Sequence, residues 1–248
     1  MPENVKQRKD CRLTADHLCA TGVGTAPITP ENTGAIMAEL GRSVMLLEVT
    51  RDGRVVGYGT GFVITEDGHL LTCAHVVRDA DSVRARMYRP GMPDDPSPWF
   101  DCEILQPVRE NIDMAVVHIT NGSGFIPLNL RDADHPVGEA EATMVLGYPF
   151  GEALNPDLTK LVHNHFLSRV FSVQNAGDDD ERCYLFGNSK AGFSGSPVFS
   201  LLDGRVVGVF DGYKLLKNEK LTEEISYFTS IRLFWKFFVE DGPADARA

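Results

Sequence analysis

Residues 44–58 read VMLLEVTRDGRVVGY, two short apolar runs on either side of Asp52-Gly53. An Asp-Gly pair accepts the left-handed backbone of a two-residue turn, so it is a strong signal for a hairpin of antiparallel strands. The same rhythm returns at residues 61–72 and 198–210, where Asp-Gly pairs again separate apolar runs. Many short strands with regular turns are typical of an all-β barrel or sandwich.

Length, composition and charge narrow the class of protein. The 248 residues can bury a sizeable core, and 43% hydrophobic with 24% charged residues is ordinary for a soluble globular chain. The formal net charge of -11 would repel phosphate backbones and anionic membrane surfaces. We therefore expect neither nucleic acid nor a membrane as a partner.

The N-terminal residues and the cysteines indicate the cellular compartment in which the protein is expected. The first ten residues carry charge but no following apolar stretch, so neither a secretory signal nor a transmembrane segment is visible, and an intracellular, cytoplasmic location is expected. Five scattered cysteines lack the short paired spacings of zinc sites: Cys11, Cys19, Cys73, Cys102 and Cys183. Reduced thiols fit this number best, and a disulfide between two of them in an exporting cell is the alternative.

Four segments have their own character. Residues 1–38 are mixed and turn-rich and predict an arm, in which Asn32 is placed to cap a short helix over 35–40. The arm would then dock on the body, and a disordered tail is the alternative. Proline-rich residues 89–98 and acidic residues 177–181 predict exposed loops. Apolar residues at helical spacing predict a closing helix over 232–238.

Residues 192–198, GFSGSPV, contain the most informative pattern. Small neighbours expose the hydroxyl of Ser194, and Gly192 accepts the backbone bend that presents it. A nucleophilic serine needs such a bend, because adjacent amide N–H groups must point to where a tetrahedral oxyanion forms. A turn between two strands would explain the same residues, so the pattern alone assigns no role.

A histidine and an aspartate complete a possible constellation. A serine hydroxyl needs a neutral imidazole to take its proton, and among seven histidines His75 stands out because a hairpin delivers it after the small Ala74. Asp113 heads an apolar strand, where a carboxylate is costly unless it is paired. Pairing with the Nδ1–H of His75 would fix the tautomer of the ring. A solvated strand start is the alternative for an isolated aspartate.

Taken jointly, in the order His75, Asp113, Ser194, these segments resemble the signature blocks of trypsin-like serine peptidases. The matching blocks are TCAH, DMAV and GFSGSP, which end at residues 75, 116 and 197. The likeness is nearest to bacterial HtrA-type peptidase domains, because GFVI from residue 61 and LGYPFG from residue 146 are similar to their barrel landmarks.

The resemblance implies an all-β, chymotrypsin-like fold of two six-stranded antiparallel β-barrels, with an N-terminal arm and a C-terminal helix. The arm would be residues 1–38 and the peptidase domain 39–248, with the first barrel at about 39–133 and the second at about 134–248. It implies a serine endopeptidase that acts on protein or peptide substrates.

The resemblance also implies roles for individual residues. An acyl-enzyme would form at Ser194, with His75 as general base and Asp113 orienting it, and the backbone N–H groups of Gly192 and Ser194 would form the oxyanion hole. Asn188 would lie near the base of the primary specificity pocket. The pocket wall, and the strand that pairs with substrate backbone by edge-strand addition, would come from Phe210, Asp211 and Gly212. No cofactor or metal is implied.

Some positions depart from the family pattern. Ser196 replaces a second glycine, and Val76 stands where secreted relatives carry a disulfide cysteine, which agrees with reduced thiols. No Ile-Val-Gly-Gly-like sequence precedes the first barrel, so competence would be intrinsic or set by a regulatory partner protein. No PDZ-like sequence follows the barrels.

Other hypotheses use the same residues. A catalytically silent double-barrel module that binds peptides or a partner is the alternative function, since folds outlive their activities. An α/β-hydrolase is disfavoured because the histidine precedes the serine and no strand-helix alternation surrounds it. Cys73 is interpreted as a small buried residue rather than a nucleophile. His163 and His165 lack a recognisable third ligand for zinc.

Overall fold

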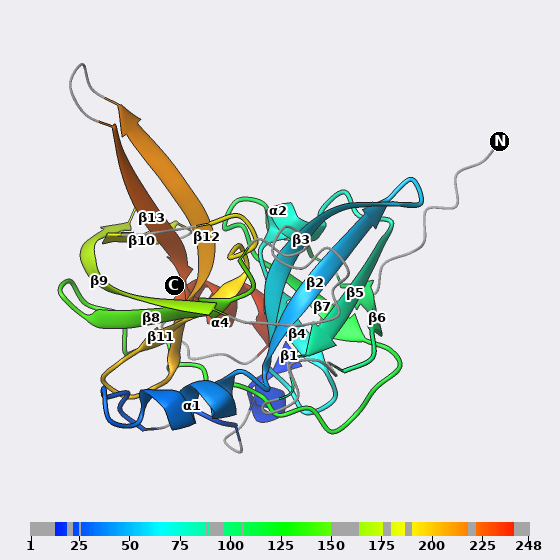
Figure 1. Cartoon of the computed structure of the whole chain (residues 1–248), viewed down its shortest axis with the longest axis horizontal. Helices are drawn as coiled ribbons and strands as arrows, with labels where there is room; N and C mark the ends of the chain where they lie inside the picture. Colours follow the sequence, from blue (N-terminus) through cyan, green and yellow to red (C-terminus); the bar gives the residue numbers. More distant parts are fainter. Residues whose placement is uncertain are drawn as a thin grey trace.

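Two β-barrels stand side by side in the computed structural model of the chain (Figure 1). The first is drawn in blue to green and the second in green to orange, and the β12–β13 hairpin of the second projects beyond the body. The structure describes residues 13–18, 22–24, 26–87, 89, 97–105, 107–149, 164–175, 180–186, 190–217 and 222–240.

The first barrel closes six antiparallel strands in the order β2-β3-β4-β7-β6-β5, with β5 returning to pair with β2. Asp52 and Gly53 both have positive φ, 50° and 71°, so the predicted hairpin turn between β2 and β3 is confirmed. The strands are β2 (Val44–Arg51), β3 (Arg54–Val63), β4 (His69–Thr72), β5 (Ser82–Met87), β6 (Phe100–Ile104) and β7 (Ala115–Ile119).

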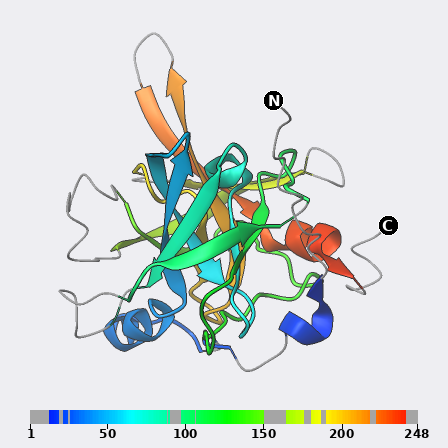
Figure 2. The ribbon, with the colours of Figure 1, turned by 90° about the vertical axis from the view of Figure 1, so that its right-hand side faces the viewer.

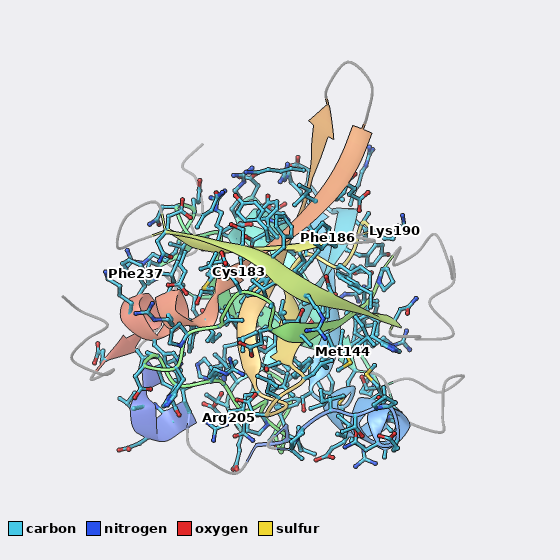
Figure 3. The ribbon with its side chains drawn as sticks, turned by 90° about the vertical axis from the view of Figure 1, so that its left-hand side faces the viewer. Met144, Cys183, Phe186, Lys190, Arg205 and Phe237 are labelled. Carbon is cyan, nitrogen blue, oxygen red and sulfur yellow. The ribbon has the colours of Figure 1, made fainter. Side chains whose placement is uncertain are left out.

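The second barrel repeats this topology in the order β10-β13-β12-β11-β8-β9, with β9 closing onto β10. Figure 3 views it from the side of β8 and β9, with Met144 labelled on β8. Its strands are β8 (Ala142–Gly147), β9 (Asn164–Asn175), β10 (Glu181–Phe186), β11 (Ser196–Ser200), β12 (Val206–Lys217) and β13 (Thr222–Ser230). Two closed six-stranded antiparallel barrels confirm the predicted chymotrypsin-like fold.

The chain also forms short helices. Besides α1 (Thr33–Leu40) and α2 (Ala74–Val77), the chain forms a closing helix, α4 (Ile231–Phe238), which confirms the predicted one. The α4 N-cap is Ser230, whose Oγ accepts from the amide of Arg232 at 3.4 Å. Helix α1 and its N-cap residue Asn32 are confirmed, but the Asn32 side chain does not cap the helix, because its Oδ1 accepts from the amide of Thr29 at 2.8 Å.

The described part of the N-terminal arm docks on the body. Strand β1 (Leu13–Thr14) pairs in parallel with β14 (Val239–Glu240), directly after α4, and η1 (Ala15–Leu18) follows β1. Figure 2 shows these blue and red segments next to each other. Further along, the amide of Val23 donates to the carbonyl of Pro127 at 2.9 Å. The predicted boundaries of arm and barrels stay predictions.

Two predicted loops are only partly described. Most of residues 89–98 and residues 177–179 lie outside the described part of the chain. The prediction of a solvated loop reaching residue 181 is wrong at its end, because Glu181 begins β10 and is buried. Its carboxylate accepts from Arg232 Nη1 at 2.8 Å, so a partner on α4 offsets the cost of burying it.

Apolar side chains form three cores, one inside each barrel and one between them. The core between the barrels includes Leu46 and Phe62 of the first barrel and Leu146 and Phe199 of the second. Tyr148, just after β8, crosses this interface, and its hydroxyl donates to the carbonyl of Val44 at 3.0 Å. The shared core therefore holds the barrels against each other where the candidate site lies.

Candidate active site

The loop before β11 presents Ser194 through two glycines with left-handed backbones. Gly192 has φ 98° and Gly195 has φ 86°, conformations that side chains with a Cβ resist. A Cβ at Gly195 would also lie 2.0 Å from the Thr60 carbonyl oxygen and 2.3 Å from Thr72 Oγ1. Both positions require glycine, so the bend expected at Gly192 is confirmed.

Thr60, on β3 of the first barrel, holds this loop of the second barrel. Its amide donates to the carbonyl of Ser194 at 2.9 Å, and its hydroxyl donates to the carbonyl of Gly192 at 2.7 Å. The same hydroxyl accepts from the amide of Tyr148 at 3.1 Å. Thr60 is not among the residues predicted from the sequence, where its one local signal is its place between Gly59 and Gly61.

We expect Thr60→Val to lower the free energy of unfolding by about 1–3 kcal/mol, because it leaves the Gly192 carbonyl and the Tyr148 amide without their partner in a buried place. Thr60→Ser keeps the hydroxyl and is the matched control. Urea unfolding of both variants measures the difference. Equal stability of the valine and serine variants would contradict the role of the hydroxyl.

Among the described residues, the backbone amides of Gly192 and Ser194 have no acceptor, so they match the predicted oxyanion hole. The Phe193 carbonyl accepts from the amide of Ser196 at 2.9 Å, which closes a tight turn around the serine. Unused donors at a bend are the chemistry that an oxyanion hole requires.

His75 lies at the start of α2, and Asp113 holds it with both carboxylate oxygens. Oδ1 accepts from the His75 amide at 2.8 Å, and Oδ2 lies 2.5 Å from Nδ1 of the ring. The His75 side chain is 39% exposed and that of Asp113 is 24% exposed. A carboxylate on Nδ1 places the ring proton there and leaves Nε2 as an acceptor.

The backbone of Asp113 is itself unusual. It has φ 51°, which few residues other than glycine, asparagine and aspartate adopt. The amide of Ala74 donates to its carbonyl at 3.1 Å, which ties the residue before His75 to the residue that binds the ring. Strain at a residue that orients another side chain is a feature of functional sites.

The segments that carry His75 and Ser194 meet over β3. A Cβ at Gly59 would lie 2.7 Å from Val76 Cγ1 and 3.4 Å from the Ser194 carbonyl oxygen, so both segments reach the same glycine. The Ser194 hydroxyl donates to the carbonyl of Asp211 at 3.0 Å. Within the described residues no hydrogen bond joins it to His75. The serine therefore has a resting partner other than the histidine.

The predicted substrate-binding residues differ in their exposure to solvent, and one of them is not described by the structure. Asn188 lies outside the described residues. The side chain of Phe210 is fully buried against Phe193 inside the second barrel, while Gly212 is partly exposed on β12. The Asp211 side chain is also buried, so its carboxyl does not face a basic side chain of a substrate. Their role in a pocket stays a prediction.

The remaining candidates are explained by their surroundings. Cys73 is buried, and this burial, with Asp211 and Asp113 nearby, raises the pKa of its thiol well above the usual range. It is therefore a thiol and not a thiolate, as a structural cysteine should be. Cys73, Cys102 and Cys183 are free cysteines. His165 is exposed on β9, and His163 lies outside the described residues.

Comparison with known proteins assigns the family. The family model described as "Trypsin-like peptidase domain" matches residues 59–209, so the chain belongs to this family. "Serine protease HTRA1" of Xenopus tropicalis is 25% identical over an aligned length of 260 residues. The match covers 93% of this chain and 52% of that protein. "Probable periplasmic serine endoprotease DegP-like" of Brucella suis biovar 1 is 29% identical over 157 residues, 63% of this chain and 28% of that protein.

These relatives are longer proteins. The chain spans about half the length of the frog relative and a smaller part of the bacterial one. The family model and these relatives confirm the predicted resemblance to trypsin-like serine peptidase domains of the HtrA type. Among the described residues, no helix has the length and apolar character needed to cross a membrane.

Proposed function

We propose that this chain is a serine endopeptidase that cleaves peptide bonds through an acyl-enzyme at Ser194, with His75 as general base and Asp113 orienting it. The observation that carries the proposal is the double contact of the Asp113 carboxylate with His75, at 2.8 Å to the amide and 2.5 Å to Nδ1. This contact leaves Nε2 free to accept the serine proton.

The residues of the candidate site can supply each proton transfer of the proposed reaction. The Ser194 hydroxyl turns from the Asp211 carbonyl to His75, gives its proton to Nε2, and Oγ attacks the substrate carbonyl carbon. The N–H groups of Gly192 and Ser194 bind the oxyanion that forms. The imidazolium returns the proton to the leaving amine as the C–N bond breaks. Water then gives a proton to His75 and attacks the ester carbonyl carbon, and the imidazolium returns this proton to Ser194 Oγ as the ester C–O bond breaks.

Strand β12 supports peptide binding by edge-strand addition. Its pairing with β11 ends at Phe210, opposite Ser196, whereas its pairing with β13 continues to Lys217. Beyond Phe210 no described strand pairs with the β11 side of β12, so main-chain groups from Gly212 onward are available to an extended peptide. Figure 1 shows this part of β12 extending past the body of the barrel.

A fluorophosphonate probe tests the proposal. We expect it to label the wild-type chain at Ser194, and His75→Ala to slow labelling by about 10⁴-fold or more, because no other group activates the hydroxyl. His135→Ala is the matched control, since His135 also pairs with an aspartate, Asp134, but on the surface. Mass spectrometry of the labelled peptide identifies the site.

A catalytically silent binding module is the competing function. It predicts no labelling of Ser194, alone or with added protein partners, together with peptide binding that survives Ser194→Ala. We also propose an intracellular location and a regulatory partner protein. The free cysteines are compatible with a reducing compartment, whereas the bacterial relative carries the word periplasmic in its name.

A further inference from the structure

Asp211 is a buried carboxyl beside the candidate site that the mechanism above leaves without a role. It lies in a β-bulge of β12, since Phe210 pairs with Phe228 of β13 and Gly212 pairs with the next residue, Tyr227. Asp211 is the extra residue between these pairs. A bulge changes the direction of the groups on the extra residue, and bulges are common next to active sites.

The main chain of Asp211 faces the candidate nucleophile. Its carbonyl accepts the Ser194 hydroxyl at 3.0 Å, the one hydrogen bond that this hydroxyl makes within the described part of the chain. The carbonyl of the preceding residue, Phe210, accepts from the amide of Gly195 at 2.8 Å. Two successive carbonyls of β12 therefore fix Ser194 and its neighbour.

The side chain of Asp211 is anchored in the interior. The residue is 5% exposed, and its Oδ2 accepts from the hydroxyl of Thr229, on β13, at 2.7 Å. On the other side, the thiol of Cys73, two residues before His75, lies 3.7 Å from Oδ1. The carboxyl thus connects the second barrel to the strand end that carries the candidate base.

The charges around this carboxyl favour its neutral form. Burial, and next the negative charge of Asp113, raise the pKa of Asp211 well above its usual range, while Thr229, Arg182 and Cys73 lower it. No ion pair with Asp211 exists among the described residues. The titratable and charged groups that face it are Cys73, Asp113, Arg182, Cys183 and Tyr227.

We propose that Asp211 is a positioning residue of the catalytic centre: its buried side chain, held by Thr229, fixes the bulge that places Ser194, because the Phe210 carbonyl binds the amide of Gly195 and the Asp211 carbonyl binds the resting hydroxyl. The inference rests on the proposed function. The Asp211 side chain acts through its shape and the hydrogen bonds of a neutral carboxyl. An asparagine amide reproduces both, and an alanine reproduces neither.

The test compares Asp211→Asn, Asp211→Ala and Thr229→Val by the rate of fluorophosphonate labelling against probe concentration. We expect Asp211→Ala to lower the maximal rate about 100-fold through misplacement of the hydroxyl, and Asp211→Asn to lower it less than about tenfold, as volume-conserving swaps do. Thr229→Val removes one hydroxyl, and its maximal labelling rate should lie between the rates of Asp211→Asn and Asp211→Ala. Probe affinity should change little, because the binding surface is kept.

A second measurement depends on the charge state alone. A raised folded pKa gives stability that is full below the unfolded value of about 3.9 and is lost as pH rises toward the folded value. The asparagine variant has no proton to lose. Its melting temperature should therefore rise relative to wild type as pH increases from 5 to about 8. An Asp211 that is ionised in both the folded and the unfolded chain predicts no change of this difference between pH 5 and about 8.

The outcomes separate the two proposals. An unlabelled wild-type chain overturns the proposed function and this inference with it. When the wild type is labelled, three results overturn the inference alone: Asp211→Ala at the wild-type rate, Asp211→Asn as slow as Asp211→Ala, or a melting temperature of Asp211→Asn that does not rise relative to wild type with pH. If Asp211→Ala does not fold, Thr229→Val against Asp211→Asn decides, and a wild-type rate for Thr229→Val overturns the inference.

Discussion

Replacing Asp113 with asparagine is expected to slow acylation of Ser194 by about 10⁴-fold without unfolding the chain. Asparagine tolerates the left-handed backbone, φ 51°, that this position requires. Its carbonyl oxygen can keep the contact with the His75 amide, 2.8 Å in the native chain. Its NH₂ group then faces Nδ1 and must donate to it.

This arrangement moves the ring proton to Nε2, which can no longer accept from the serine. The labelling rate with a fluorophosphonate measures the effect, and circular dichroism checks the fold. Asp134→Asn is the matched control, because Asp134 pairs with His135 at 2.8 Å on the surface and should leave the rate unchanged. A rate for Asp113→Asn within about tenfold of wild type would be inconsistent with the orienting role, since that equals only about 1.4 kcal/mol.

The second large effect is expected at Gly195, immediately after the candidate nucleophile. Alanine there combines a left-handed backbone, φ 86°, with a Cβ placed 2.0 Å from the Thr60 carbonyl oxygen. That oxygen cannot retreat easily, because it lies in β3 and accepts from the Thr72 hydroxyl at 2.7 Å. We expect Gly195→Ala to lose about 2–5 kcal/mol of unfolding free energy, the sum of backbone strain and overpacking.

A matched control isolates the steric part of this effect. Gly53 also has positive φ, 71°, but a Cβ there meets no atom within 4 Å. Gly53→Ala should therefore lose only the strain, about 1–2 kcal/mol. Urea unfolding of both variants gives the two values. A Gly195→Ala variant as stable as Gly53→Ala, with its serine still labelled, would show that the close approach to Thr60 is not required.

Features set by neighbouring residues could be read from the sequence. The β2–β3 hairpin follows from Asp52-Gly53, since that dipeptide accepts the turn wherever it occurs. The closing helix over 231–238 follows from its apolar spacing. The missing side-chain cap at Asn32 also has a local cause, because the Asn32 side chain accepts from the Thr29 amide instead of from an amide of the helix.

The blocks around His75, Asp113 and Ser194 could be recognised without a structure, because each consists of neighbouring residues, and their resemblance to a known family implied the double barrel. The role of Thr60 could not be predicted in this way, because its hydroxyl bonds to Gly192, which lies 132 residues further along the sequence. Counting along β12 also cannot place Asp211, because one bulged residue breaks the alternation of faces. The contact between the Ser194 hydroxyl and the carbonyl of Asp211, and the burial of the Asp211 carboxyl, could not be predicted, because both depend on strands packed from distant parts of the chain.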